Sequence, residues 1–140
     1  MRVTCPAFGT VLDLERPPRR VVSFVSSATE TLFELGCGEA VIGVTPYCSR
    51  YVDGLSAPVV GDYLKTDLAA LKALEPDLVL VTLGIQTAFG RRLAQAGLPV
   101  YALPLPASRH GILENQLTLG GLMHRVPEAR ALSRRMEAGF

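Results

Sequence analysis

The chain has 140 residues, of which 49% are hydrophobic and 19% charged, with a formal net charge of +1. This length suits one domain of ordinary size, and the composition excludes a disordered chain. We expect no nucleic-acid partner, because the arginine groups have no interleaved aromatic residues and look like solvated faces, and no apolar run reaches the ~18 residues of a membrane span.

Apolar periodicity predicts strands that alternate with helices after an irregular lead-in, residues 1–19. Short β-branched runs indicate buried strands, whereas apolar residues three or four apart indicate helices. Strands are predicted at residues 10–14, 20–25, 40–44, 59–60, 78–82 and 99–103. Helices are predicted at residues 27–35, 67–74, 88–96, 108–123 and 127–138. This alternation is typical of a three-layer α/β lobe with a mainly parallel sheet.

Local signals predict where the helices begin and end. Ser27 opens a capping-box pattern, and Gly36 suits the left-handed position that follows a helix. Thr66 or Asp67 is expected to cap the next helix. Pro127 fits the first turn of the last helix, because its missing N–H costs nothing there.

Polar residues follow the predicted strands, and parallel α/β sheets bind ligands at the carboxyl ends of their strands. Ser26 and Ser27 follow the strand at residues 20–25, while Thr82 and Gly84 follow the strand at 78–82. We therefore name these four as candidate ligand-binding residues. Ser27 also has a simpler interpretation, as a helix cap.

The sequence contains no convincing catalytic or metal-binding constellation. His110 and Glu114 are four residues apart, but two potential ligands do not make a metal site, so we expect a solvated pair. Gly36 and Gly38 follow a helix rather than a strand, unlike the glycines of a dinucleotide-binding loop. We therefore predict that the chain is not an enzyme and has no metal site and no intrinsic cofactor. A small α/β enzyme or nucleotide-binding protein is the alternative from another class.

The cysteines and the N-terminus bear on localisation. Cys5, Cys37 and Cys48 match neither a disulfide framework nor a CxxC metal site, so we expect free thiols. A Cys37–Cys48 bridge is the alternative if the protein is exported. The first six residues lack the apolar stretch of a signal peptide. The protein is therefore expected in the periplasm or at the cell surface if a leader has been removed, and in the cytoplasm otherwise.

Five stretches resemble the type III, helical-backbone solute-binding proteins of ABC importers, which include binders of vitamin B12, siderophores and haem. They are residues 18–23 (PRRVVS), 27–36 (SATETLFELG), 41–45 (VIGVT), 68–79 (LAALKALEPDLV) and 97–100 (GLPV). The resemblance implies two α/β lobes that face each other across a ligand cleft and are joined by a long helix. Residues 20–126 would be the N-terminal lobe and 127–140 the truncated start of that helix, with the second lobe absent.

The resemblance is greatest to the vitamin B12-binding branch, and it implies a cobalamin-like ligand or another metal chelate. Tyr47 and Tyr63 match positions where aromatic side chains of that branch pack on the corrin ring, each stacked pair contributing ~0.5–1.5 kcal/mol. Thr82 stands where the family often has an aromatic residue. Delivery to an ABC permease is also implied, with Asp67 as the docking residue, although an acidic residue also suits a helix start.

Two further ligand and partner hypotheses share this fold. An iron–siderophore or haem ligand would be favoured by cations near the strand ends, where Arg50 and Lys65 are the candidates. The chain would otherwise be an isolated α/β interaction domain without a transport ligand. Self-association through the truncated helix is also expected, because Leu132 and Met136 would be left exposed.

Overall fold

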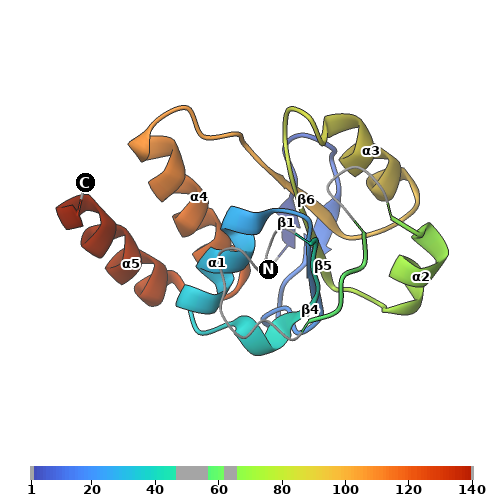
Figure 1. Ribbon diagram of the computed structural model, residues 1–140, viewed down its shortest axis with the longest axis horizontal. Coiled ribbons are helices and arrows are strands. Elements are labelled where there is room, and N and C mark those ends of the chain that lie inside the picture. Colours follow the sequence, from blue (N-terminus) through green and yellow to red (C-terminus); the bar gives the residue numbers. More distant parts are fainter. Residues whose placement is uncertain (1, 47–56, 62–65, 140) are drawn as a thin grey trace.

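The computed structural model describes residues 2–46, 57–61 and 66–139. Within them, a four-stranded sheet has the strand order β4-β3-β5-β6, and each neighbouring pair is parallel (Figure 1). The strands are β3 (Val21–Ser23), β4 (Val41–Gly43), β5 (Leu78–Thr82) and β6 (Val100–Leu103). The predicted α/β class with a mainly parallel sheet is confirmed.

Helices cover both faces of this sheet (Figure 1). One face carries α1 (Ser26–Glu34), α4 (Arg109–Leu122) and, outside them, α5 (Val126–Gly139). The other face carries α2 (Leu68–Ala73) and α3 (Thr87–Gln95). A short 3₁₀ turn, η1 (Gly38–Ala40), leads into β4. The layers are therefore helix, sheet and helix, as the alternating pattern predicts.

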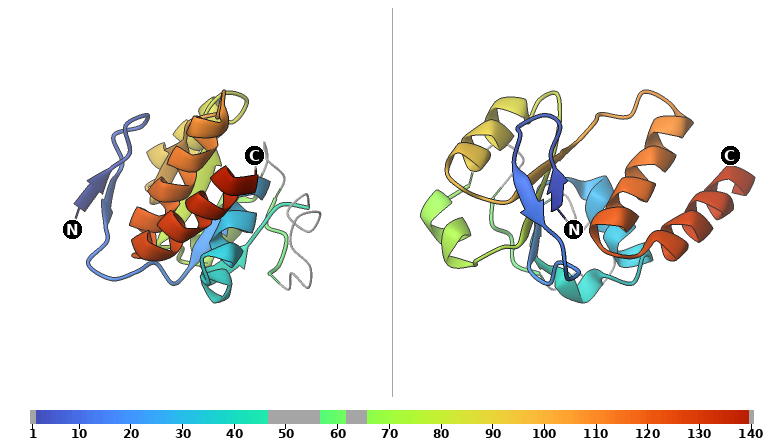
Figure 2. Two further views of the ribbon diagram at one scale, coloured as in Figure 1. Left: turned by 90° about the vertical axis from the view of Figure 1, so that its left-hand side faces the viewer. Right: turned by 180° about the vertical axis from the view of Figure 1, so that it is seen from behind.

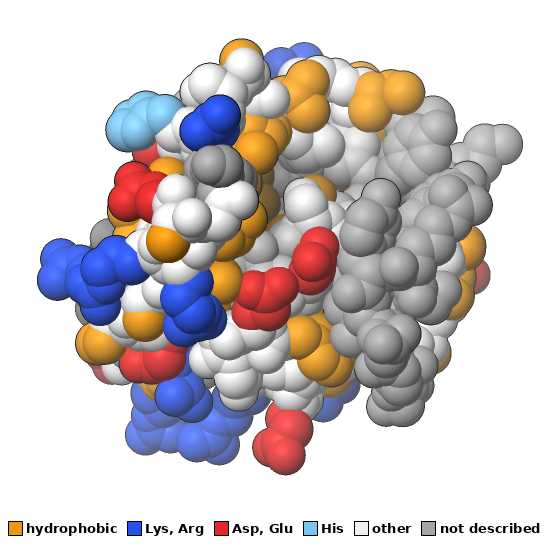
Figure 3. Space-filling view, turned by 60° about the vertical axis from the view of Figure 1, so that its left-hand side comes forward, with side chains coloured by type: hydrophobic (Ala, Val, Ile, Leu, Met, Phe, Trp, Pro, Cys, Tyr) orange, Lys and Arg blue, Asp and Glu red, His pale blue; other side chains and the backbone are white. Residues whose placement is uncertain are grey.

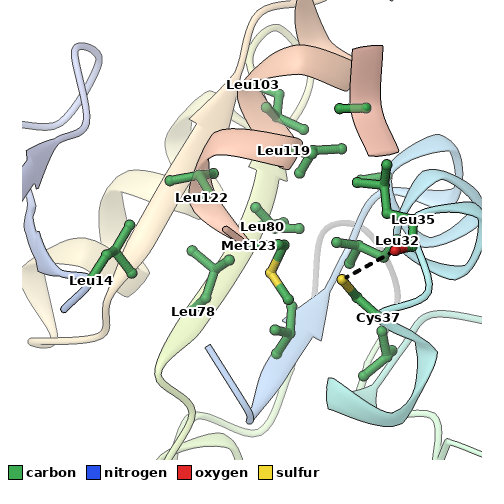
Figure 4. Packing of buried hydrophobic residues seen from close by; sticks show 14 of the residues in the cluster. Leu14, Leu32, Leu35, Cys37, Leu78, Leu80, Leu103, Leu119, Leu122 and Met123 are labelled. Carbon is green, nitrogen blue, oxygen red and sulfur yellow. Dashed lines mark hydrogen bonds between the residues drawn. The ribbon is translucent and has the colours of Figure 1, made fainter. Parts of the chain in front are cut away.

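Strand β5 shows why the sheet has two cores. Leu78 and Leu80 belong to the apolar cluster on the α1 and α4 side, whereas Val79 and Val81 belong to the cluster on the α2 and α3 side. All four side chains are fully buried. Figure 4 shows the first cluster, with side chains of β5, α1 and α4 directed toward one another. A continuous apolar run is what a strand needs when helices cover both of its faces.

The N-terminal segment forms a hairpin that the sequence did not predict in full. Strand β1 (Arg2–Thr4) pairs antiparallel with β2 (Val11–Asp13), outside the main sheet (Figure 2). The short strand predicted at residues 10–14 is confirmed, but the irregular lead-in is wrong at β1. Three residues give no readable periodicity, and β1 is held by pairing and by the partial burial of Val3.

Helix α1 begins at Ser26, one residue before the predicted cap. Val25 is the N-cap residue, in an extended conformation, and no side chain caps the helix. The Val25 carbonyl accepts the Thr29 N–H at 3.0 Å and the Thr29 hydroxyl at 3.2 Å. Ser27 therefore lies in the first turn with its side chain exposed, and the capping-box prediction is wrong.

The other end of α1 follows the predicted pattern. Gly36 has a φ of +82°, the left-handed conformation that costs glycine little. Its N–H donates to the Phe33 carbonyl at 3.1 Å, and the Cys37 N–H donates to the Leu32 carbonyl at 2.9 Å. These two bonds are a Schellman motif, which satisfies the carbonyls left free at a helix end.

Helix α5 packs along α4, so the predicted exposure of Leu132 is wrong. Leu132 is only 3% exposed, and Met136 is half-buried against the same core. The Gln116 side chain of α4 donates to the Met136 sulfur at 2.6 Å and accepts the Ser133 hydroxyl at 3.2 Å. Because α4 covers this face of α5, the apolar surface expected to drive self-association is already buried.

Two shorter predictions have different outcomes. Asp67 caps α2, because its carboxylate accepts the Ala70 N–H at 3.2 Å. The strand predicted at residues 59–60 is reduced to one parallel bridge, between Val44 and Val59.

Across the described ranges, none of the helices combines the length and apolarity needed to cross a membrane.

Candidate functional site

A cavity of about 160 Å³ lies at the carboxyl ends of the strands, where α1 and α4 approach β5 and β6. Val25 and Ala28 border it on the α1 side, and Leu103 and Leu119 border it on the β6 and α4 side. Its remaining described lining residues are Ser27, Thr31, Thr82, Leu105, Pro106, Ile112, Asn115 and Gln116. This cavity is at the edge where parallel α/β sheets bind ligands.

Two of the predicted site residues, Ser27 and Thr82, line this cavity. Gly84 lies in the exposed turn after β5 with a φ of +100°, and its N–H donates to the Thr87 hydroxyl oxygen at 2.9 Å. A Cβ added to Gly84 would lie 3.8 Å from the cavity residue Leu105, so the turn is beside the cavity. Ser26 is the half-buried first residue of α1 and is outside the lining.

The remaining predicted site residues either lie outside the described residues or are absent from the cavity lining. Tyr47 and Tyr63 lie outside the described residues, as do Arg50 and Lys65. Asp67 is exposed at the start of α2, where it serves as the helix cap.

Gln86 is a buried residue of this edge that sequence reasoning did not single out. Its side chain is 1% exposed. The Gln86 amide donates to the Phe24 carbonyl at 3.0 Å and accepts the Thr82 N–H at 2.9 Å. One side chain therefore links the end of β3 to the end of β5. Its position at a predicted strand end was visible in the sequence, but Phe24 is 62 positions away.

Helix α4 supplies the other polar residues that the sequence did not reveal. Asn115 and Gln116 line the cavity from α4. The Asn115 side chain donates to the Pro104 carbonyl at 2.9 Å, which fixes the segment after β6 to the helix. No sequence signal marked this pair, because α4 reaches the strand ends only through tertiary packing.

Exposed apolar side chains surround the same edge. Ile85 is 66% exposed in the turn after β5, Leu105 is 68% exposed after β6, and Ile112 is 38% exposed in α4. Figure 3 shows hydrophobic side chains gathered along a hollow on one side of the molecule. Apolar side chains grouped at a strand-end edge, rather than scattered singly, indicate a binding surface.

The opposite edge of the sheet carries a second cavity of about 490 Å³. It lies among the loop before β3, the turn after α1 and the turn between α4 and α5. Arg19, Glu39, His124 and Arg125 line it together with Cys37, so its polar groups are of both charges. The His124 ring nitrogen Nε2 lies 2.7 Å from the Leu14 carbonyl oxygen.

No metal centre is visible in the part of the chain that the structure describes. Within it, no three side chains of His, Cys, Asp or Glu are grouped for a metal ion. His110 and Glu114 are 2.9 Å apart with side chains 82% and 64% exposed, so the predicted solvated pair is confirmed. Cys5 and Cys37 are buried free thiols, whereas Cys48 lies outside the described residues.

Burial raises the pKa of the Cys37 thiol above its ordinary value, which the nearby Arg125 guanidinium partly offsets. The folded chain thus holds this proton more tightly than the unfolded chain. Its contribution is present below the unfolded pKa of about 8.5 and is lost as the pH rises through the folded pKa. Cys37→Ala should therefore flatten the decline in stability that sets in as the pH rises above about 8.

Urea denaturation followed by circular dichroism at several pH values measures this decline. Burial also raises the pKa of Tyr101, so a residual decline is expected at the alkaline end. Parallel pH profiles for the parent chain and Cys37→Ala would contradict the assignment.

Comparison with known proteins gives a family and a set of relatives. The family model described as periplasmic binding protein matches residues 21–139. A cobalamin-binding protein from Halobacterium salinarum is 32% identical over 132 residues, which are 93% of this chain and 36% of that protein. The chain thus spans about a third of the length of this relative.

Solved structures share the fold. A petrobactin-binding protein from Bacillus subtilis has a TM-score of 0.79 at 20% identity, covering 99% of this chain and 50% of the other. A periplasmic haem-binding protein from Pseudomonas aeruginosa has a TM-score of 0.75 at 22% identity, covering 86% and 44%. At these identities the likeness shows the fold alone. The family match extends from the start of β3 to the end of α5, and the chain belongs to the periplasmic binding protein family.

Proposed function

We propose that this chain is part of the solute-binding component of an ABC importer and that it contacts its ligand at the carboxyl edge of the sheet. The observation that carries this is the cavity between α1 and α4 with exposed Ile85, Leu105 and Ile112 beside it. Apolar surface with a few polar groups is typical of small-molecule sites. Family membership supports capture and delivery rather than catalysis, and a location outside the cytoplasmic membrane.

We propose a cobalamin-like ligand first. The named function of the Halobacterium salinarum relative supports this choice, as does the neutral lining of the cavity. A flat macrocycle with an apolar face would cover the exposed side chains, and Tyr47 and Tyr63 would stack on it. Haem or an iron–siderophore is the alternative, supported by the named ligands of the fold relatives. The partner is an ABC permease, with Asp67 as the proposed docking residue.

Isothermal titration calorimetry of the purified chain, with cyanocobalamin, haemin and a ferric siderophore as separate ligands, tests this proposal. Saturable binding of cyanocobalamin at micromolar levels is expected. Tyr47→Ala and Tyr63→Ala should each weaken it by about two- to tenfold, because each removes one stacked pair. Tyr47→Phe keeps the ring and should retain the affinity.

The other outcomes are equally informative. Preferential binding of haemin or the siderophore would favour the alternative ligand over a corrinoid. Failure of the folded chain to bind any of the three chelates would overturn the proposed function.

A further inference from the structure

We propose that the cavity between α1 and α4 is a subsite for an uncharged side group of the ligand that both donates and accepts hydrogen bonds, such as a primary amide, and that it rejects a carboxylate. The inference rests on the proposed function in one respect, namely that this edge of the sheet faces the ligand. It adds the chemical class that the cavity selects and the residues that select it.

Size restricts the group first. A cavity of about 160 Å³ is close to the volume that admits one benzene-sized molecule, about 150 Å³. It is too small for a macrocycle and large enough for a side group of about five heavy atoms, such as a propionamide. The exposed Leu105 and Ile112 at its border would then contact the body of the ligand.

Charge restricts the group next. None of the described residues that line this cavity is charged, and most of them are apolar. The cavity on the opposite edge differs, since Arg19, Arg125 and Glu39 contribute to its lining. Moving a carboxylate or an ammonium from water into a neutral, largely apolar cavity is costly unless it meets a partner charge.

The two threonines of the cavity then decide between donors and acceptors. The Thr31 hydroxyl donates to the Ser27 carbonyl at 3.0 Å. The Thr82 hydroxyl lies within donating distance of the Leu103 carbonyl, at 3.3 Å. While these carbonyls hold the single hydrogen of each hydroxyl, each threonine oxygen offers a ligand only its lone pairs. Both threonine oxygens would therefore accept a hydrogen bond from a donor group of the ligand.

The amides of α4 complete the mixture. The Asn115 side-chain nitrogen donates to the Pro104 carbonyl, and the Gln116 nitrogen donates to the Met136 sulfur. Each NH₂ group has a second hydrogen, and the Asn115 carbonyl oxygen accepts no bond from the described residues. A ligand amide matches this set, because its NH₂ group meets the threonine oxygens while its oxygen accepts an N–H. A carboxylate would instead place its charge against the threonine lone pairs.

This chemistry separates the chelates that the fold could carry. Corrinoids bear peripheral primary amides, whereas haem bears two propionates. The cavity therefore favours the corrinoid periphery through contacts that are independent of ring stacking. Neutral acceptors facing an anion are a repulsive element, and specificity often depends on such elements.

Fragment binding tests the cavity without any chelate. Propionamide and propionate are added separately to the ¹⁵N-labelled chain at about 10–100 mM, the range expected for five heavy atoms. Propionamide should shift the amide signals of Thr31, Thr82 and Asn115 in a saturable way, and propionate should not. Absence of shifts with propionamide, or equal shifts with propionate, would overturn the proposal.

Substitution tests the selecting residues. Thr31→Val and Thr82→Val keep the shape but remove the acceptor oxygen, and each should weaken propionamide about fivefold. Thr118→Val is the matched control, a half-buried threonine of α4 outside the cavity lining, and should leave binding unchanged. Equal losses for all three variants would indicate a general structural effect and overturn the assignment.

Intact ligands separate this inference from the proposed function. Cyanocobalamin is compared with derivatives in which one peripheral amide has been hydrolysed to a carboxylic acid. At least one derivative should bind more than tenfold more weakly than cyanocobalamin. Thr82→Val should reduce this ratio between the two dissociation constants. Corrinoid binding without such discrimination would overturn the subsite and leave the proposed function standing. Selective propionamide binding without binding of any chelate would overturn the proposed function and leave the subsite standing.

Discussion

Replacing Gln86 with leucine is expected to lower the free energy of unfolding by about 2–5 kcal/mol, because two buried backbone groups lose their partners at once. The Thr82 N–H and the Phe24 carbonyl both bond to the Gln86 side chain. A leucine of similar size fills the space but satisfies neither group. Urea denaturation followed by circular dichroism measures the loss.

Gln95→Leu is the matched control for this substitution. Gln95 is the exposed last residue of α3, and its replacement should change stability by no more than about 0.5 kcal/mol. Gln86→Glu should be at least as destabilising as Gln86→Leu, because it buries an unpaired carboxylate that faces the Phe24 carbonyl oxygen. A Gln86→Leu chain as stable as the Gln95→Leu chain would show that the link contributes nothing.

Two adjacent glycines of α4 should respond to alanine with opposite signs. A Cβ at Gly120 would overlap the Cβ of Ala129 in α5 and lie 3.2 Å from the Arg125 carbonyl oxygen. A Cβ at Gly121 meets nothing within 4 Å. Gly120→Ala should therefore destabilise the chain by about 1–3 kcal/mol. Gly121→Ala should stabilise it by up to about 1 kcal/mol, because alanine is the better helix former.

The same denaturation measurement applies to both variants, each of which adds one methyl group, at neighbouring positions. Their difference isolates the close approach of α4 and α5 from helix propensity. Changes of the same sign would contradict this account of how the two helices pack.

Local physical chemistry decided which parts of the fold could be read from the sequence. The apolar run of β5 and the glycine after α1 are local signals, and the structure follows both. Ser27 was read as a cap because its side chain suits that role, but the extended Val25 starts the helix one residue earlier. Burial of Leu132 depends on α4, which no local signal connects to it.

The candidate site divides in the same way. Thr82 and Ser27 were expected at the ligand edge because they follow strands, and both line the cavity. Gln86 and Asn115 escaped notice because their bonding partners are brought close only by the tertiary fold. Strand ends are visible in a sequence, whereas a helix that returns over them is not.

The N-terminal hairpin has a consequence for polymerisation of the protein by strand pairing between molecules. The β6 strand ends the sheet on one side, and the outward N–H of Ala102 meets the buried sulfur of Cys5 at 3.4 Å. An open strand edge is a template on which another molecule can add a strand. Because a thiol accepts hydrogen bonds only weakly, the protection is chiefly steric. The hairpin thus covers the β6 edge and prevents the sheet of one molecule from continuing into the sheet of another.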